Sequence, residues 1–240
     1  MEVVLIPGDG IGKEISESVN EVSKILKTNI EWETHFAGAE YYEKTGKLFD
    51  DTMMDAIQAT GIALKGPTAT PIGTGFRSIN VQLRQKFSTY ANLRPVHSIE
   101  GVKSRFEDVD LVIVRENSED LYKGIEYMYD ANTAHGIKLI TKDASEKIAR
   151  FAFEYAKKHH RKKVTAVHKA NIMKVCDGLF LDAFNKVAEE YPEIEHDSVI
   201  IDALCMKLVV DPTKYDVLVT ENLYGDIISD LCAGLVGGLG

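Results

Sequence analysis

The sequence predicts an α/β protein, because short apolar strands alternate with helices of amphipathic spacing along its 240 residues. Runs such as Val3–Ile6 and Val109–Val114 have the length and composition of buried strands. Charged or amide side chains follow several of these runs directly. Ligands bind at the carboxyl ends of strands in open α/β sheets. The fold class therefore predicts that the functional residues follow strands.

The chain opens with a strand at Val3–Ile6, a glycine loop, and a helix that extends to about Lys27. This order resembles a dinucleotide-binding turn. The glycines, however, are spaced Gly-x-Gly-x-Gly, and Lys13 occupies the position of the third glycine or alanine of a Rossmann fingerprint. We therefore do not predict a standard Rossmann site here.

Further along the chain, period-2 and period-3.6 patterns continue to alternate. They predict strands at 30–36, 62–65, 90–96, 109–114, 164–167, 199–201 and 217–219, and helices at 39–45, 52–59, 78–87, 141–161 and 225–235. A further helix follows the strand at 164–167 and extends to residue 191. Residues 66–75 form a loop rich in Gly, Pro and Thr, whose backbone can approach a ligand closely. Residues 122–139 are interpreted as an extended arm that pairs with a second subunit.

Composition argues against several classes of partner. The net charge of −9 disfavours generic attraction to nucleic acid or to an anionic membrane. The basic run 157–163 suits a helix C-terminus as a solvated face, with a nucleic-acid patch as the alternative. No apolar run approaches membrane-spanning length. No signal peptide is visible and the cysteines are widely separated, so a reduced, cytoplasmic protein is predicted. The final GLVGGLG is typical of a helix end, which suggests part of a longer protein.

Arginine is concentrated in one stretch. Of seven arginines, five lie between Arg77 and Arg115, although lysines outnumber arginines three to one in the whole chain. The planar guanidinium holds carboxylates in a fixed orientation better than an ammonium does. Arg84, Arg94 and Arg115 are therefore candidates to converge on one small polyanion. Pairing with local acids such as Glu116 is the alternative for each arginine.

Polar side chains with possible roles in binding or proton transfer accompany these arginines. Ser78 and Asn80 precede Arg84 on the predicted helix, and Ser78 is alternatively its N-cap. Tyr122 is a candidate proton donor, with simple packing as the alternative. Lys169, which follows an apolar strand, is either a buried general acid or base or an ion-pair lysine.

Two carboxylates share a face of the last predicted helix. Asp226 and Asp230 are four residues apart, so both point to the same side. Together with Asp202, which follows another strand, they form an oxygen ligand set suited to Mg²⁺ or Mn²⁺. A solvated helix face is the alternative for the pair.

Five segments together resemble one family. They are RSINVQLRQ, YANLRPV, VRENSEDLYKGIEY, VHKANIMK and ENLYGDIISDL, in that order, and the opening IPGDGIGKE is similar to the family's start. The family is that of the metal-dependent β-decarboxylating dehydrogenases, which act on isocitrate, isopropylmalate, homoisocitrate or tartrate. The resemblance implies the fold of this family, with two α/β domains around a shared sheet. It implies a large cofactor-side domain of residues 1–90 with about 226–240, and a small domain of 91–225 that carries the dimerisation elements and the arm.

The resemblance also implies a role for each candidate residue. Substrate carboxylates are held by Arg84, Arg94 and Arg115; Ser78 and Asn80 hold the extra carboxylate of isocitrate. Tyr122 and Lys169 match the family's proton-transfer pair, Thr70 and Asn171 its cofactor side, and Asp202, Asp226 and Asp230 its metal ligands. In the family's dimers, Lys169 and Asp202 come from the partner subunit.

The implied activity is oxidative decarboxylation of isocitrate to 2-oxoglutarate in the tricarboxylic acid cycle, with NAD or NADP and Mg²⁺ or Mn²⁺, in a homodimer. The adenosine-binding loops of the family lie beyond residue 240, so the choice between NAD and NADP stays open, with NAD preferred. The alternatives are isopropylmalate or homoisocitrate dehydrogenase and a non-catalytic regulatory subunit. An unpaired Ser–Asn pair would be a poor pocket for an alkyl group, which favours isocitrate.

Overall fold

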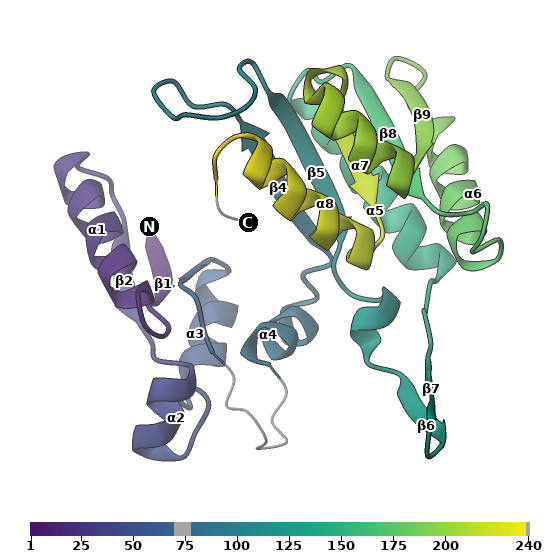
Figure 1. The fold of residues 1–240 in the computed structure, drawn as a ribbon. Coiled ribbons are helices and arrows are strands. Elements are labelled where there is room, and N and C mark those ends of the chain that lie inside the picture. The colour runs from purple at the N-terminus through teal and green to yellow at the C-terminus, as the bar shows by residue number, and fades with distance from the viewer. Residues whose placement is uncertain (70–77, 239–240) are drawn as a thin grey trace. The chain divides into compact units, whose positions relative to one another are not determined.

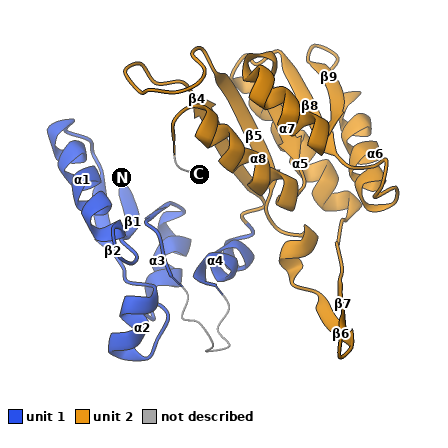
Figure 2. Ribbon diagram, viewed as in Figure 1, with its two compact units in different colours: residues 1–88 blue, residues 89–240 orange. Residues whose placement is uncertain are grey.

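The computed structural model describes residues 1–69 and 78–238, and the chain divides into two units (Figures 1 and 2). The first unit runs from Met1 to Ser88, and the second begins at Thr89. Strands and helices alternate in both units, so the predicted α/β class is confirmed. The described strands form a three-stranded sheet in the first unit, and a five-stranded sheet and a two-stranded hairpin in the second.

The first unit contains a three-stranded parallel sheet. Strand β1 (Glu2–Ile6) is central and pairs with β2 (Glu31–Thr34) and β3 (Ala63–Lys65). Four helices accompany this sheet: α1 (Gly12–Ile25), α2 (Ala39–Thr45), α3 (Met53–Thr60) and α4 (Ile79–Phe87). Residues from β1, α3 and α4 form its small core, which includes Ile6, Met53 and Ile79.

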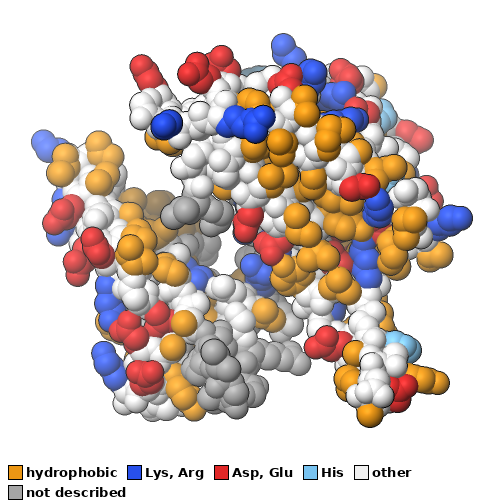
Figure 3. Space-filling view, in the orientation of Figure 1, with side chains coloured by type: hydrophobic (Ala, Val, Ile, Leu, Met, Phe, Trp, Pro, Cys, Tyr) orange, Lys and Arg blue, Asp and Glu red, His pale blue; other side chains and the backbone are white. Residues whose placement is uncertain are grey.

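Helix α1 does not bury the face that its apolar spacing suggests. Its buried residues are Gly12, Ser16 and Ser23, whereas Val22 is 54% and Ile25 78% exposed. Figure 3 shows hydrophobic side chains gathered over this helix. The spacing thus predicts the helix correctly, but it does not identify the face that packs within this chain.

The glycine loop after β1 is shaped by contacts between two backbone segments. Gly8 has φ +76°, and a Cβ atom there would lie 2.0 Å from the carbonyl oxygen of Pro67. A Cβ atom at Gly12 would lie 2.2 Å from the carbonyl oxygen of Pro7. Between these glycines, the Asp9 carboxylate accepts a hydrogen bond from the Ala69 amide at 2.7 Å. Close packing of two loops therefore requires these glycines, without any nucleotide.

The second unit contains a five-stranded mixed sheet in the order β4-β5-β10-β8-β9. Its strands are β4 (Ala91–His97), β5 (Asp110–Glu116), β8 (Lys163–His168), β9 (Glu195–Ile200) and β10 (Val217–Thr220). Only β4 is antiparallel to its neighbour. The carboxyl ends of β5, β8, β9 and β10 consequently lie at one edge of the sheet.

Helices cover both faces of this sheet. Val112 and Val114 of β5 point to the side covered by α5 (Lys142–Lys158) and α6 (Cys176–Ala188). Leu111 and Ile113 alternate to the other side, covered by α7 (Ile201–Val210) and α8 (Asn222–Leu235). This three-layer arrangement buries β5 on both faces and makes it a rigid base for Arg115 at its end.

The predicted arm contains a short helix and a hairpin. Residues of η1 (Asp120–Lys123) precede β6 (Glu126–Asp130) and β7 (Thr133–Gly136), which pair antiparallel. Hydrophobic side chains of the hairpin are exposed, as Figure 3 shows. Pairing of this arm with a second subunit stays a prediction.

Two of the differences in element boundaries concern candidate site residues. The strand expected at 199–201 spans Glu195–Ile200, so Asp202 lies in the first turn of α7 rather than at the end of the strand. The helix expected at 225–235 begins at Asn222. Helix α8 packs against β4, β5 and α7 of the second unit, whereas the assignment of residues 226–240 to the large domain stays a prediction.

The cysteines are free, as their wide separation in the sequence predicts. Cys176, Cys205 and Cys232 form no disulfide, and Cys232 alone is fully buried. Within residues 1–69 and 78–238, every helix is too short or too polar to span a bilayer.

Candidate functional site

Arg115 is the centre of a polar cluster at the carboxyl edge of the second unit's sheet. Its side chain is 1% exposed and donates from Nε to the Asn222 backbone oxygen at 2.9 Å and from Nη2 to Asn222 Oδ1 at 2.7 Å. Its Nη1 forms an ion pair with Asp226. Pairing with Glu116 is therefore wrong for this arginine. Glu116 instead accepts hydrogen bonds from the backbone of Ser118 and Glu119.

A glycine allows α8 to begin directly against Arg115. A Cβ atom at Gly225 would lie 2.3 Å from Thr220 Oγ1 and 2.5 Å from Cγ of Arg115. Thr220 is the register partner of Arg115 on the neighbouring strand. The absent side chain thus brings the first turn of α8 onto the ends of β5 and β10.

Arg94 reaches the same helix from β4. Its Nη1 donates to Ser229 Oγ at 2.6 Å and lies 3.3 Å from Asp230 Oδ1, and its Nη2 lies 3.9 Å from Asp226 Oδ1. Two arginines therefore offset the repulsion between the two carboxylates on one helix face. For Asp226 the solvated-face alternative is wrong, whereas the Asp230 side chain is 65% exposed.

Tyr122 completes this group. Its hydroxyl donates to Asp226 Oδ2, and the Arg115 guanidinium lies 5.1 Å from its ring centre. Burial and the Asp226 carboxylate raise the pKa of Tyr122, so the phenol keeps its proton at neutral pH. We call Arg94, Arg115, Tyr122, Asp226 and Asp230 the α8 cluster.

The charge of Asp226 is favoured by these neighbours. Burial alone would raise the pKa of Asp226, but the Tyr122 hydroxyl and the Arg115 guanidinium outweigh it and lower this pKa below its usual value. The carboxylate is therefore ionised and available to a cation at neutral pH.

Lys169 and Asp202 form a separate ion pair. Lys169 Nζ lies 2.6 Å from Asp202 Oδ1, and the two side chains are 26% and 69% exposed. Lys169 is thus a half-buried, ion-paired lysine in this chain, and its role as a general acid or base stays a prediction. Asn171, in the turn after Lys169, has an exposed side chain.

The predicted metal ligands do not gather within one chain. Among the residues described, no group of three His, Cys, Asp or Glu side chains could hold a metal ion. Asp226 and Asp230 lie on α8, and Asp202 is held by Lys169 at the start of α7. The two carboxylates of α8 offer only oxygen donors, which suit Mg²⁺ or Mn²⁺ but leave the set incomplete.

Ser78 and Asn80 lie in the first unit. Ser78 occupies the N-cap position of α4, as the alternative predicts, but its side chain makes no capping hydrogen bond. The Oδ1 atom of Asn80 is buried and has no hydrogen-bond partner among the described residues. Arg84 lies on the same helix, and Thr70 falls outside the described residues.

Lys65 is a candidate site residue that the sequence patterns did not identify. It ends β3, and its Nζ donates to the backbone oxygen of Gly66 at 2.7 Å. Burial lowers the pKa of Lys65; Asp9 opposes this effect and Arg84 adds to it. Its position as the last residue of a predicted strand was the available signal.

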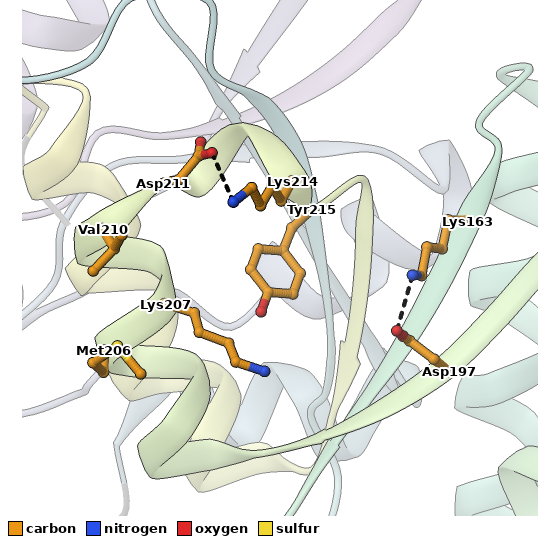
Figure 4. Close-up of a pocket in the computed structure, with 8 residues that line it drawn as sticks. All are labelled: Lys163, Asp197, Met206, Lys207, Val210, Asp211, Lys214 and Tyr215. Atoms are coloured by element: carbon orange, nitrogen blue, oxygen red, sulfur yellow. Dashed lines mark ion pairs between the residues drawn. The ribbon is translucent and has the colours of Figure 1, made fainter.

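A cavity of about 310 Å³ lies at the opposite edge of the second unit's sheet (Figure 4). Lys163, at the start of β8, and Tyr215, just before β10, line it together with Lys207 of α7. No predicted site residue lines this cavity. The candidate chemistry is therefore not in this cavity but at the carboxyl ends of the strands.

Known proteins resemble this chain in sequence and in structure. The family model described as "Isocitrate/isopropylmalate dehydrogenase" matches residues 2–240. A crystal structure of isocitrate dehydrogenase from Methylococcus capsulatus superposes with a TM-score of 0.94 at 48% identity, covering 99% of this chain and 71% of that one. The fold class of this family is therefore confirmed.

Curated relatives carry names of more than one activity. The chain is 49% identical to the chloroplastic 3-isopropylmalate dehydrogenase of Solanum tuberosum over its whole length, which is 67% of that protein. It is 51% identical to the mitochondrial isocitrate dehydrogenase [NAD] catalytic subunit 5 of Arabidopsis thaliana, covering 98% of this chain and 63% of that protein. It is 52% identical to a mitochondrial isocitrate dehydrogenase [NAD] regulatory subunit of Dictyostelium discoideum, covering 100% and 66%.

These names correct one prediction and leave another without support. The relatives are named as chloroplastic or mitochondrial proteins, which contradicts the prediction of a cytoplasmic protein. Catalytic and regulatory subunits are named separately, so the relatives do not support a homodimer. The chain spans about two thirds of the length of the relatives that it matches.

Proposed function

Because this chain belongs to the isocitrate/isopropylmalate dehydrogenase family, we propose that it carries out oxidative decarboxylation of isocitrate to 2-oxoglutarate and CO₂. The hydride goes to NAD, with NADP as the alternative. Identity does not decide the substrate, since relatives named for isocitrate and for isopropylmalate are about equally similar.

The buried amide of Asn80 carries the choice of substrate. A buried polar atom without a partner costs about 1–3 kcal/mol. Asn80 Oδ1 is such an atom among the described residues, and the Ser78 side chain is not used for capping. The ionised extra carboxylate of isocitrate only accepts hydrogen bonds, so it would pair with the Ser78 hydroxyl and the Asn80 NH₂ group, which the isopropyl group of isopropylmalate would leave without a partner. This difference favours isocitrate.

The α8 cluster supports binding and proton transfer. Arg94 and Arg115, with Arg84 from α4, hold the carboxylates of the substrate. Tyr122 keeps its proton at neutral pH and is hydrogen-bonded to Asp226, so it acts as a donor to the substrate carbon after CO₂ leaves. Lys169 is the second member of the proton-transfer pair.

Asp226 and Asp230, with Asp202, would hold the divalent metal ion. When bound, Mg²⁺ or Mn²⁺ stabilises negative charge that develops on the substrate oxygens. The oxygen donors fit either ion. Thr70 and Asn171 are proposed to contact the nicotinamide cofactor.

A second subunit would complete the site. The Lys169–Asp202 pair and the α8 cluster have no hydrogen bond or ion pair between them among the described residues, and neither alone holds three metal-binding side chains. A second subunit of the same family, in the simplest case a second copy, would bring its own Lys169 and Asp202 to the α8 cluster of the first. The arm, residues 122–139, is proposed to pair in this contact.

Absorbance of reduced nicotinamide tests the proposed reaction. The protein is mixed with Mg²⁺ and isocitrate, with NAD and NADP in separate assays, and with isopropylmalate and a chelator as controls. We expect a signal with isocitrate that the chelator abolishes. A larger signal with isopropylmalate would contradict the substrate assignment.

A non-catalytic regulatory subunit is the second candidate, because one relative is named as such. Tyr122, Lys169 and all three aspartates are present, which favours a catalytic subunit. Calorimetry separates the two candidates. Isocitrate binding without nicotinamide reduction, from a folded and assembled protein, would support the regulatory function.

A further inference from the structure

Lys138 inserts a buried ammonium group between three segments of the second unit. It lies between β7 and α5, and its side chain is 9% exposed. Its Nζ forms ion pairs with Asp177 and with Glu221, the latter at 2.6 Å, and both carboxylates are at most 1% exposed. The ring centre of Tyr224 lies 4.5 Å from Nζ. The proposed chemistry uses none of these residues directly.

One of the two carboxylates is connected to the Lys169–Asp202 pair, and the other to the α8 cluster. Asp177, in the first turn of α6, accepts a hydrogen bond from the backbone amide of Lys169 at 2.6 Å through its second oxygen. Glu221 is the residue directly before α8, which carries Asp226. A single ammonium thus holds the turn after β8 and the start of α8 against the base of the hairpin.

We propose that Lys138 is a positioning residue, which fixes the backbone at Lys169 through Asp177 and the first turn of α8 through Glu221. This proposal rests on the proposed function of Lys169. Lys138 does not touch the reacting atoms. It acts by holding Lys169 in place, because a displacement of about 1 Å can lower a rate by about a hundredfold.

The charges of the group are consistent with this role. Two carboxylates face one ammonium, with Asp120 nearby. Burial raises the pKa of Glu221 to about 8; Lys138 opposes this effect, and Asp177 and Asp120 add to it. Glu221 Oε1 is buried without a partner among the described residues, so the group contains more carboxylate oxygens than donors. Loss of Lys138 would leave Asp177 without its cation and loosen its hold on the Lys169 amide.

Amide hydrogen exchange tests this proposal independently of activity. In Lys138→Met we expect the Lys169 amide to exchange at least about tenfold faster, while amides of β10 keep their rates. Lys163→Met is the matched control. Lys163 starts β8, the strand that ends directly before Lys169, and it also pairs with two carboxylates, Glu195 and Asp197. The control leaves the Lys169 amide unchanged. Unchanged exchange at Lys169 in Lys138→Met would overturn the proposal.

Kinetics distinguish positioning from a general structural role. We expect Lys138→Met to lower kcat about tenfold or more while KM for isocitrate stays within about twofold, since the α8 cluster binds the carboxylates. In a Lys169→Ala background, the same substitution should cause little further loss. Equal losses in both backgrounds would contradict action through Lys169.

Two further variants keep the test decisive. Lys138→Arg retains the charge and should restore most of kcat. If Lys138→Met does not fold, Asp177→Asn replaces it in the same measurements, since this variant keeps the shape but loses the charge. Faster exchange at Lys169 in a protein without isocitrate activity would refute the proposed function and leave the positioning role intact.

Discussion

Two amphipathic helices, one in each unit, differ in whether they bury their apolar stripe. Helix α5 of the second unit buries its apolar stripe, including Ile148 and Phe153, against the sheet and α6. Helix α1 of the first unit places Ser16 and Ser23 inside and leaves Val22 and Ile25 exposed. Amphipathic spacing therefore indicates a helix, whereas the surrounding elements decide which face is covered.

The candidate residues differ between the units in the same way. Arg115 has its hydrogen bonds and ion pair already formed with Asn222 and Asp226, so its orientation is fixed before any ligand binds. Asn80 has a buried oxygen without a partner among the described residues. The second unit thus presents a preorganised group, and the first unit presents a polar surface that a ligand would complete.

The largest effect is expected in the core of the second unit. Phe153 stacks on Phe184 and Tyr191 at ring separations of 5.4 and 5.1 Å. Phe153→Ala should lower the free energy of unfolding by about 3–5 kcal/mol. Ile25→Ala, on exposed α1, should change it by less than about 0.5 kcal/mol. Urea unfolding followed by circular dichroism compares them, and similar losses would refute the contrast between the two helices.

Substitution of Arg115 tests the preorganised group of the second unit. Arg115→Lys keeps the charge but loses the fixed fork that joins Asn222 and Asp226, so kcat/KM for isocitrate should fall about 10²–10³-fold. Arg150→Lys is the control, because Arg150 forms an exposed ion pair with Glu190. That variant should stay within about twofold. A loss below tenfold for Arg115→Lys would contradict its assigned role.

Substitution of Ser78 and Asn80 tests the polar surface of the first unit. Replacing both with apolar residues removes the proposed partners of the extra carboxylate. The ratio of kcat/KM for isocitrate to that for isopropylmalate should fall about 10–200-fold. Equal losses with both substrates would refute the pocket assignment.

A smaller, pH-dependent effect is expected in the first unit. His35 Nδ1 lies 2.9 Å from Asp50, and its Nε2 lies 3.0 Å from Glu33. Burial alone would lower the pKa of His35, but these carboxylates outweigh it and raise the pKa above 6.5. The stabilisation is fully present below pH 6.5 and is lost as the pH rises through the folded-state pKa.

His35→Gln should therefore be more destabilising at pH 6 than at pH 9. The fluorescence of Trp32, the single tryptophan, reports on the first unit during urea unfolding. A destabilisation of equal size at both pH values would contradict the charge of His35.

Sequence patterns predicted most elements and part of the site, for identifiable reasons. Arg115 and Asn222 follow predicted strands, and the carboxyl ends of parallel strands meet at one edge, so their proximity was predictable. The partners of Arg115 were not, because Asn222 lies 107 residues away and its contact depends on the order of strands in the sheet. The role of Gly225 could not be predicted either, because it appears only when α8 is placed on β5.

Residues without a local pattern were missed altogether. Lys138 lies in a polar segment, and its burial arises only where three segments meet at the edge of the sheet. The separation of Asp202 from Asp226 was also beyond sequence patterns, because both residues lie in the first two turns of helices that follow strands. In both cases the topology, rather than the local sequence, determines the contacts.

Mixing two inactive variants tests most directly whether the site is built from two subunits. Lys169→Met disables the Lys169–Asp202 pair, and Asp226→Asn disables the α8 cluster, so each variant alone should be inactive. In randomly mixed two-fold assemblies, half of the pairs contain one intact site of two, and about a quarter of the original activity should return. Mixing Lys169→Met with Asp202→Asn, two defects in the same pair, should restore none. Failure of the first mixture to recover activity, when both variants assemble with the unmodified chain, would contradict the shared site.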